Sequence, residues 1–405
     1  MRVLVVTWAW PSHYMPLVPT LWALRAEGHE VCVASQPALA RTVTDSGMVF
    51  AAAGEDLDHA ELHRRRLRGL DHTGVPEAPP PGAGAERFSP AEREKVSRVF
   101  GIFADRADAM VDDVIALGRT WRPDVILYEP TSYAGPLAAA VLGIPAVRHL
   151  HGVDLTYQVH GLMPELLAPT ARRLGLPGVN VLGDLTVDPC PPSMQVPADV
   201  DRVRIRHVPY NGPAVLPDWL RPPRPPGSPR RICVTFGRTT TALNGKGLFL
   251  PPVVVEAARA LDAEIVVALD PKDREALGDV PAGVRVVESL ALHLLLPSCE
   301  AVVHQGGIGT TLAAAAAGVP QLVLPQLPDQ IFTAERVAAT GAGLMLRPAA
   351  TDDLVPAIAR ALSALVEGDV HRDAAARLRD EMQGQPAPLA AVPTLERLTR
   401  TRSTS

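Results

Sequence analysis

Strand-like and helix-like patterns alternate along this 405-residue chain, stop at a proline-rich stretch and then begin again. The apolar run 2–8 is followed by an amphipathic stretch 17–27 that ends at Gly28, and then by a second apolar run at 30–34. Short strands that alternate with helices favour a parallel sheet with crossover helices. The further strands predicted in this way are 124–128, 146–149, 231–236, 264–269, 284–287, 301–303 and 321–324, and the further helices include 90–118 and 252–261.

Two breaks in composition interrupt this alternation. Residues 67–90 include a run of proline, glycine and alanine that cannot hold a helix or an inner strand, so we predict a long mobile loop there. Residues 208–229 are rich enough in proline to predict a stiff, extended connector between domains. The sequence therefore predicts an α/β fold of two Rossmann-like, doubly wound domains that face each other across a central cleft.

The domain boundaries are predicted from the same breaks. We assign residues 1–212 to the first domain, 213–230 to the proline-rich linker and 231–385 to the second domain. The C-terminal segment 386–405 contains a helical stretch at 394–399, which is placed so that it could cross back and brace the first domain.

The composition narrows the classes of function. A net charge of -5 and a pI near 6.2 provide no general attraction to polyanions, so neither nucleic acid nor an anionic membrane is expected as a partner. No signal-peptide pattern and no apolar run of membrane length is present, which favours a cytoplasmic location without membrane insertion. The four cysteines lack metal-ligand spacing and are interpreted as free thiols that are mostly buried.

Two loops that follow strands of the first domain carry a histidine and a carboxylate. Ligands of open α/β sheets bind beyond the carboxyl ends of the strands. His13 follows a proline-fixed turn and precedes a predicted helix, whose positive end favours a neutral imidazole that can act as a base. Glu129 ends the strand 124–128, where it could hold the second nitrogen of that histidine. An exposed or capping role is the alternative for His13, and helix capping or arginine pairing is the alternative for Glu129.

A third loop is rich in glycine and hydroxyl groups. Its residues are His304-Gln305-Gly306-Gly307-Ile308-Gly309-Thr310-Thr311, and an alanine-rich helix follows as far as Gly318. Glycines let a ligand approach the backbone, and the N–H groups at a helix start attract an anion such as phosphate. A turn that only packs the helix close to the sheet is the structural alternative, because the third glycine of a dinucleotide fingerprint is missing.

This loop, with Pro325-Gln326-Leu327-Pro328-Asp329-Gln330 downstream, resembles the donor-binding signature of the GT-B nucleotide-sugar glycosyltransferases. The likeness covers nearly the whole chain, and residues 8–31, 206–219 and 235–237 resemble the actinomycete antibiotic glycosyltransferases of family GT1. Those enzymes glycosylate aromatic polyketides and macrolides. The resemblance implies a GT-B fold, an acceptor site in the first domain and a nucleotide-sugar site in the second.

The resemblance also implies roles for individual residues. His13 would remove the acceptor proton, and Glu129 stands where the family usually has an aspartate. Ser289, at a position where many relatives carry tryptophan, and Leu290 would contact the nucleobase, while Asp329 and Gln330 would bind the sugar hydroxyls. The residues that match the diphosphate site are Gly237, Arg238, Thr239, His304, Gly306, Gly307, Gly309, Thr310 and Thr311.

The acceptor side contains several large apolar and aromatic residues. They suit a flat, hydrophobic molecule, although core packing is the competing interpretation for each of them. The residues assigned to acceptor binding are Trp10, Tyr14, Met15, Tyr133 and His151.

These assignments predict an inverting, metal-independent glycosyltransferase. It would move a deoxysugar from a nucleoside diphosphate, with dTDP favoured, to a natural-product aglycone, with an aromatic polyketide favoured and O- and C-linkage both open. No cofactor other than the nucleotide-sugar cosubstrate and no metal ion is expected. A nucleotide-sugar epimerase on the same fold and a non-catalytic, nucleotide-sugar-binding auxiliary protein are the alternatives, and a homodimer is compatible with the sequence.

Overall fold

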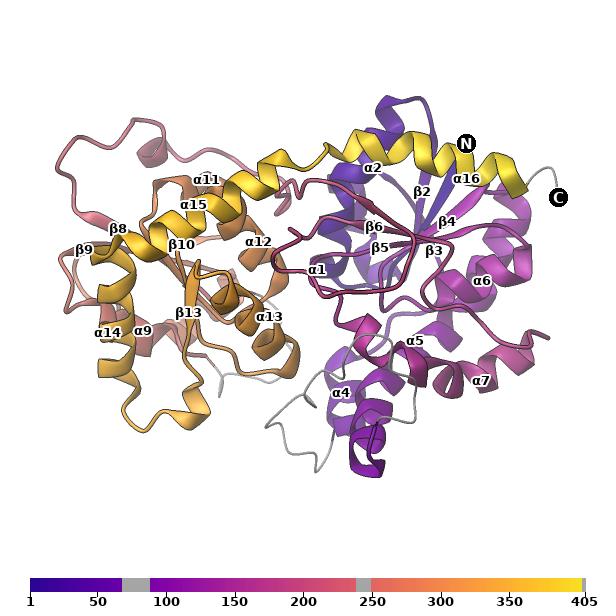
Figure 1. Cartoon of the computed structure of the whole chain (residues 1–405), viewed down its shortest axis with the longest axis horizontal. Helices are drawn as coiled ribbons and strands as arrows, with labels where there is room; N and C mark the ends of the chain where they lie inside the picture. Colours follow the sequence, from indigo (N-terminus) through magenta and orange to yellow (C-terminus); the bar gives the residue numbers. More distant parts are fainter. Residues whose placement is uncertain (68–87, 238–248, 403–405) are drawn as a thin grey trace.

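The computed structural model describes residues 1–67, 88–237 and 249–402. Two α/β domains lie side by side, each built around one parallel sheet (Figure 1). Every pairing between neighbouring strands is parallel, as expected when helices connect successive strands. The predicted α/β fold is therefore confirmed.

The first domain contains a seven-stranded sheet in the order β3-β2-β1-β4-β5-β6-β7. Its strands are β1 (Arg2–Val6), β2 (Glu30–Ser35), β3 (Val49–Ala52), β4 (Val125–Tyr128), β5 (Ala146–His149), β6 (Leu185–Asp188) and β7 (Arg202–Arg204). Its helices are α1 (Pro11–Tyr14), α2 (Val18–Ala26), α3 (Ala40–Asp45), α4 (His59–Leu67), α5 (Pro90–Trp121), α6 (Ala134–Leu142) and α7 (Met163–Arg173).

The second domain contains a six-stranded sheet in the order β10-β9-β8-β11-β12-β13. Its strands are β8 (Arg230–Thr235), β9 (Ala263–Leu269), β10 (Val284–Glu288), β11 (Ala301–His304), β12 (Gln321–Val323) and β13 (Gly343–Met345). The helices of this half of the chain are α9 (Pro251–Ala258), α10 (Arg274–Leu277), α11 (Leu292–Leu295), α12 (Ile308–Ala317), α13 (Pro328–Ala339), α14 (Leu354–Glu367), α15 (Asp369–Gly384) and α16 (Val392–Arg402).

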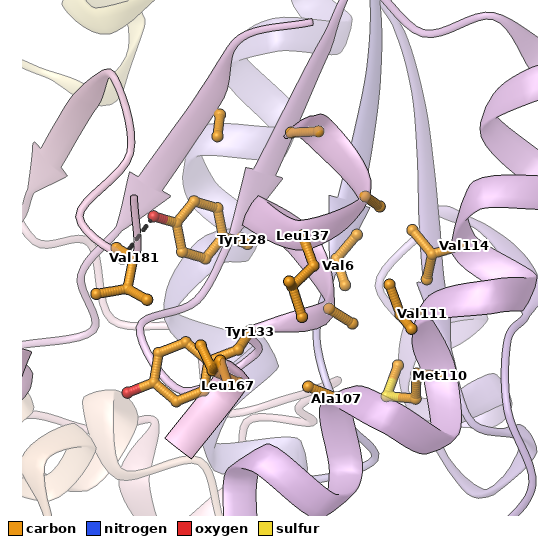
Figure 2. Packing of buried hydrophobic residues seen from close by; sticks show 14 of the residues in the cluster. Val6, Ala107, Met110, Val111, Val114, Tyr128, Tyr133, Leu137, Leu167 and Val181 are labelled. Carbon is orange, nitrogen blue, oxygen red and sulfur yellow. Dashed lines mark hydrogen bonds between the residues drawn. The ribbon is translucent and has the colours of Figure 1, made fainter. Parts of the chain in front are cut away.

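Strand β1 shows how the first sheet is buried on both faces. Alternate side chains of a strand point to opposite faces, so Leu4 and Val6 enter one hydrophobic cluster while Val3 and Val5 enter the other. Figure 2 shows the first cluster, in which Val6 lies among side chains from helices α5 and α6. A strand covered by helices on both faces has to be apolar throughout, which explains the continuous apolar run in the sequence.

The long helix α5 begins at a capping box. The Ser89 hydroxyl accepts a hydrogen bond from the Glu92 N–H, the Glu92 carboxylate accepts one from the Ser89 N–H, and Pro90 occupies the first turn. The predicted mobile loop falls mostly on residues 68–87, which lie outside the described residues.

The C-terminal helix α16 packs on the first domain. In Figure 1 the yellow segment runs from the second domain across to the first and ends near the N-terminus. Val392 and Leu395 join the hydrophobic cluster on one face of the first sheet, and His29 Nε2 lies 3.3 Å from Glu396 Oε1. The end of the chain therefore ties the two domains together.

Among the described residues, no helix has both the length and the apolar character that a membrane crossing requires.

Contacts between the domains also form near the ends of the strands. A Cβ placed on Gly152, in the loop after β5, would overlap the side chain of Ile308 at the start of α12. Arg336 of α13 donates to the backbone oxygens of Met194 and Gln195 in the first domain, at 2.8 and 3.2 Å. The loop after β5 therefore lies directly against the glycine-rich turn, and only glycine fits at position 152.

Candidate active site

The ends of two neighbouring strands bring His13 and Glu129 together. Strands β1 and β4 pair in parallel with Val6 opposite Tyr128, so the loops that follow them leave the same edge of the sheet. His13 Nδ1 lies 3.1 Å from Glu129 Oε2. With Nδ1 directed at the carboxylate, Nε2 is the ring nitrogen available to meet a substrate. His13 lies within the short helix α1, which precedes the predicted helix, α2.

The Glu129 carboxylate is buried and well supplied with donors. It accepts hydrogen bonds from the Thr131 N–H at 3.0 Å, from the Thr131 hydroxyl at 2.8 Å and from the Ser132 hydroxyl at 2.5 Å. Burial raises its pKa, but the His13 charge and the hydrogen bonds from His13 and Ser132 outweigh burial and lower the pKa to about 2. A permanently ionised carboxylate fixes the orientation of His13 and stabilises its cationic form.

His151 adds a second imidazole to this site. It follows β5, and its ring centroid lies 4.8 Å from that of His13. Its Nδ1 atom is buried and has no hydrogen-bond partner among the described residues. Burial, with smaller effects from His13 and His149 that exceed the opposing effect of Glu129, lowers the pKa of His151 to about 3. His151 is therefore neutral at physiological pH, with its Nδ1 atom unpartnered among the described residues.

These three side chains could also hold a metal ion. One ligand atom each from His13, Glu129 and His151 lie within 4.8 Å of one another. Two imidazoles and a carboxylate form a donor set that suits Zn²⁺. The expectation that the reaction needs no metal is therefore one that experiment has to test.

Of the residues assigned to acceptor binding, two tyrosines point elsewhere. Tyr14 is fully buried, and its hydroxyl lies 2.6 Å from the Ser46 hydroxyl. Tyr133 is 1% exposed and lies in the hydrophobic cluster that Figure 2 shows. Both side chains are structural in this structure, which corrects their assignment to the acceptor site. Trp10 and Met15 remain partly exposed, and the Met15 methyl carbon lies 3.5 Å from the Cβ position of Gly212.

The donor-side turn is shaped by a buried histidine. His304 is fully buried, its Nε2 lies 2.9 Å from Gln321 Oε1, and its Nδ1 accepts a hydrogen bond from the Gly306 N–H at 3.0 Å. Burial lowers the pKa of His304 to about 4, so the ring is neutral. Because both ring nitrogens are engaged, His304 supports the turn instead of pointing at a diphosphate, which corrects the expected direct contact.

Glycine is required at the centre of this turn. Gly306 has φ of 93°, and a Cβ there would lie 2.9 Å from the Gln330 backbone oxygen and 3.0 Å from Val323 Cγ1. The Cβ position of Gly309, in contrast, meets no atom within 4 Å, so its side of helix α12 faces open space. Helix α12 starts without a side-chain cap, so backbone N–H groups are left to receive an anion.

Two other donor-side side chains are used within the protein. The buried Thr311 hydroxyl donates to the Gly307 backbone oxygen at 3.1 Å. Gln330 Oε1 accepts from the N–H groups of Gln326 and Leu327 and so caps the start of α13. Thr310 is partly exposed, and Asp329 is exposed and near enough to His13 to feel its charge. The donor-side turn therefore faces the His13 site across the junction between the domains.

The second loop of the donor side is only partly described. Gly237 lies in the turn after β8, which pairs with β11, and its Cβ position lies 2.6 Å from Gln305 Nε2. The predicted diphosphate residues Arg238 and Thr239 lie outside the described residues. Gln305, 4% exposed, also lies 2.9 Å from the Cβ position of Gly307 and thus fills the space between the two loops. Gln305 is not among the residues predicted for the diphosphate site, although its polar side chain lies inside the glycine-rich signature.

The predicted nucleobase residues lie at the end of β10. Ser289 is exposed, has φ of 54°, and its N–H donates to the Leu269 backbone oxygen at 3.1 Å. Leu290 is partly buried against a cluster of the second domain. A left-handed serine presents its backbone without a bulky side chain, so a base at this position would meet backbone groups and Leu290.

Comparisons with known proteins agree with this arrangement. Residues 22–237 match the family described as Erythromycin biosynthesis protein CIII-like, N-terminal domain, and residues 252–398 match the corresponding C-terminal domain. The chain is 38% identical to 10-deoxymethynolide desosaminyltransferase of Streptomyces venezuelae, over 98% of this chain and 97% of that protein. It is also 38% identical to aklavinone 7-beta-L-rhodosaminyltransferase of Streptomyces galilaeus, over 98% and 96% of the two chains.

A solved structure gives the same result. Spinosyn rhamnosyltransferase SpnG, complexed with thymidine diphosphate, superposes with a TM-score of 0.82 and 33% identity, covering 98% of this chain and 100% of that one. The paired parallel-sheet domains, with a histidine–carboxylate pair facing a glycine turn, define a glycosyltransferase of the GT-B fold. Within that class, the chain belongs to the erythromycin biosynthesis protein CIII-like family of antibiotic glycosyltransferases.

Proposed function

We propose that this glycosyltransferase moves a deoxysugar from dTDP to the hydroxyl or ring carbon of a natural-product aglycone, with inversion at the anomeric carbon. The observation that carries the proposal is the His13–Glu129 pair, 3.1 Å apart, with its buried and ionised carboxylate. The relatives support the substrate classes, because two of them are by name a 10-deoxymethynolide desosaminyltransferase and an aklavinone 7-beta-L-rhodosaminyltransferase, and a solved neighbour is complexed with thymidine diphosphate.

The reaction follows from the positions of the two sites. The acceptor gives its proton to His13 Nε2, and its oxygen or carbon forms a bond to the anomeric carbon as the bond from that carbon to the diphosphate oxygen breaks. Glu129 stabilises the imidazolium that results. The charge that develops on the leaving diphosphate would be met by the backbone N–H groups at the start of α12. A single displacement inverts the configuration, and we propose that it needs no metal ion.

The test is sugar transfer by the purified protein. A panel of dTDP-deoxysugars would be combined with aromatic polyketide and macrolide aglycones, and products would be measured by mass, with the anomeric configuration determined by NMR. Inverted product is expected. A product of retained configuration would contradict the single displacement. Conversion of the donor without an acceptor would indicate an epimerase, and donor binding without any turnover would indicate an auxiliary protein.

A further inference from the structure

A buried arginine lies next to the His13 site, and no carboxylate of the described residues pairs with it. Arg106, from helix α5, is 5% exposed, and its guanidinium carbon lies 3.8 Å from the centroid of the Trp8 ring. Trp10 and His59 complete what we call the Arg106 cluster, defined as Trp8, Trp10, His59 and Arg106. His59 lies edge-on to both tryptophans, with ring centroids 5.1 and 5.4 Å apart.

The hydrogen bonds of Arg106 leave part of the guanidinium unsatisfied. Its Nη2 lies 3.1 Å from His59 Nδ1, while its Nε is buried and has no hydrogen-bond partner within residues 1–67, 88–237 and 249–402. Burial and the Arg106 charge lower the pKa of His59 to about 4, so His59 is neutral and accepts the hydrogen bond from Arg106. In that described part of the chain, no carboxylate forms an ion pair with Arg106.

The Arg106 guanidinium stays protonated although it is buried. Burial lowers the pKa of Arg106 to about 10, although the charges of Glu129 and Asp105 oppose that effect. The group is therefore charged at neutral pH, and it lies close enough to feel Glu129. A buried charge without a hydrogen-bonded counter-charge is costly, and such groups are uncommon unless a ligand or another group meets them. An arginine is also well suited to this, because its planar group binds an anionic oxygen while it stacks on an aromatic ring.

The Arg106 cluster is directly continuous with the catalytic pair. The Trp8 indole N–H donates to the Thr131 hydroxyl at 3.0 Å, and that hydroxyl in turn donates to Glu129. The Trp8 ring centroid lies 4.8 Å from that of His13 and 5.3 Å from that of Trp10, which is partly exposed. The Arg106 cluster therefore adjoins the catalytic pair through Trp8, and Trp10 is its partly exposed member.

We propose that Arg106 binds an ionised or enolised phenolic oxygen of the acceptor, on the same ring system as the group that reacts at His13. The acceptor class is then an acidic aromatic polyketide, and a macrolide that carries only neutral hydroxyls lacks the recognised group. This assignment rests on the proposed function for the reaction at His13. Arg106 is then a residue that determines which acceptors the enzyme accepts. Charge-assisted hydrogen bonds between partly buried groups account for about a 10- to 100-fold difference in affinity.

Binding without turnover tests the inference. The probe is a pair of acceptors with the same polyphenolic polyketide skeleton, one with a free acidic phenol beside the reacting position and one with that oxygen methylated. Calorimetry in the absence of donor would give the dissociation constant of each. Wild type should bind the free phenol at least 10-fold more tightly. Arg106→Gln should bind both compounds equally, and Arg106→Lys should keep part of the preference. Arg119→Gln, an exposed residue on the same helix, is the matched control and should behave as wild type.

The outcomes separate this inference from the proposed function. Equal binding of the two compounds by wild type, or an undiminished preference in folded Arg106→Gln, would overturn the role of Arg106. If Arg106→Gln does not fold, the ratio of the two dissociation constants in wild type and in Arg106→Lys still shows whether Arg106 recognises the phenol. dTDP affinity should be the same in all variants, because the donor side is untouched. A phenol preference without any sugar transfer would remove the proposed function but leave this binding site in place.

Discussion

The two halves of the site use different parts of the polypeptide. On the acceptor side, the side chains of His13 and Glu129 face each other, and the second ring nitrogen of His13 is left for a substrate. On the donor side, the side chains of His304, Thr311 and Gln330 form hydrogen bonds within the protein, so these three residues shape the glycine turn and leave the backbone N–H groups at the start of α12 available to a ligand. The first domain therefore supplies side chains that can transfer a proton, and the second supplies a backbone turn held in one conformation.

The largest effect expected from this difference is the loss of His13. His13→Ala removes the proposed base without touching the donor-side turn, so kcat should fall by about 100- to 10,000-fold. The affinity for dTDP, measured by calorimetry, should stay within about twofold of wild type. Ser12→Ala, an exposed neighbour in the same short helix, is the control. Unchanged turnover in His13→Ala would take the base away from His13.

A smaller loss is expected when Glu129 keeps its shape and loses its charge. Glu129→Gln should lower kcat by about 100-fold, because the imidazolium loses its counter-charge and the His13 ring its orientation. Single-turnover rates would show this, with thermal unfolding of the same samples as the control for folding. A kcat within twofold of wild type would show that His13 acts without its carboxylate.

The same substitution should change acid stability in a defined direction. The pKa of Glu129 is lowered from its ordinary value of 4.5 to about 2 in the folded state, because its hydrogen bonds and the His13 charge outweigh burial. The stabilisation is therefore fully present above pH 4.5 and is lost as the pH falls toward 2, and it amounts to about 3 kcal/mol. Urea unfolding at a series of pH values should show the wild-type advantage over Glu129→Gln shrinking across that window. An advantage that is constant with pH would contradict the lowered pKa.

On the donor side, the expected damage comes from adding atoms to the backbone. Gly306→Ala places a Cβ 2.9 Å from the Gln330 backbone oxygen at a φ of 93°, so the turn must shift. We expect a loss of about 1–3 kcal/mol in the free energy of unfolding and weaker dTDP binding. Gly309→Ala is the matched variant, because its Cβ meets no protein atom. It should keep wild-type stability, and weaker dTDP binding in this variant alone would place the diphosphate beside Gly309.

Most inner strands and their parallel pairing were predictable because they depend on local patterns, whereas the strand order and the strands β3, β6, β7 and β13 were not predicted. Continuous apolar runs identified β1 and β4, and the rule that ligands bind beyond strand ends directed attention to the loops after them. His13 and Glu129 were paired on that basis, although they are far apart in the sequence. The order of strands in a parallel sheet places such loops side by side, and local sequence is enough to find them.

The directions of individual side chains were much less predictable. Tyr14 follows His13 in the same short helix, and neighbouring helical positions point about 100° apart, so one faces the site and the other the core. Arg106 and His59 meet only because α5 folds back over α4, which no local pattern reveals. The hydrogen bonds that engage both nitrogens of His304 likewise depend on Gln321 in the neighbouring strand.

The smallest effect we expect is that of removing metal ions. If the backbone N–H groups at the start of α12 meet the charge of the leaving diphosphate, EDTA should leave the rate of sugar transfer within about twofold. The acceptor side responds differently, because His13, Glu129 and His151 could together bind Zn²⁺, which would block the base. Added Zn²⁺ should therefore inhibit, and EDTA should reverse the inhibition. A rate that collapses in EDTA and returns with Mg²⁺ would show instead that a cation, and not the backbone of the donor-side turn, carries the leaving-group charge.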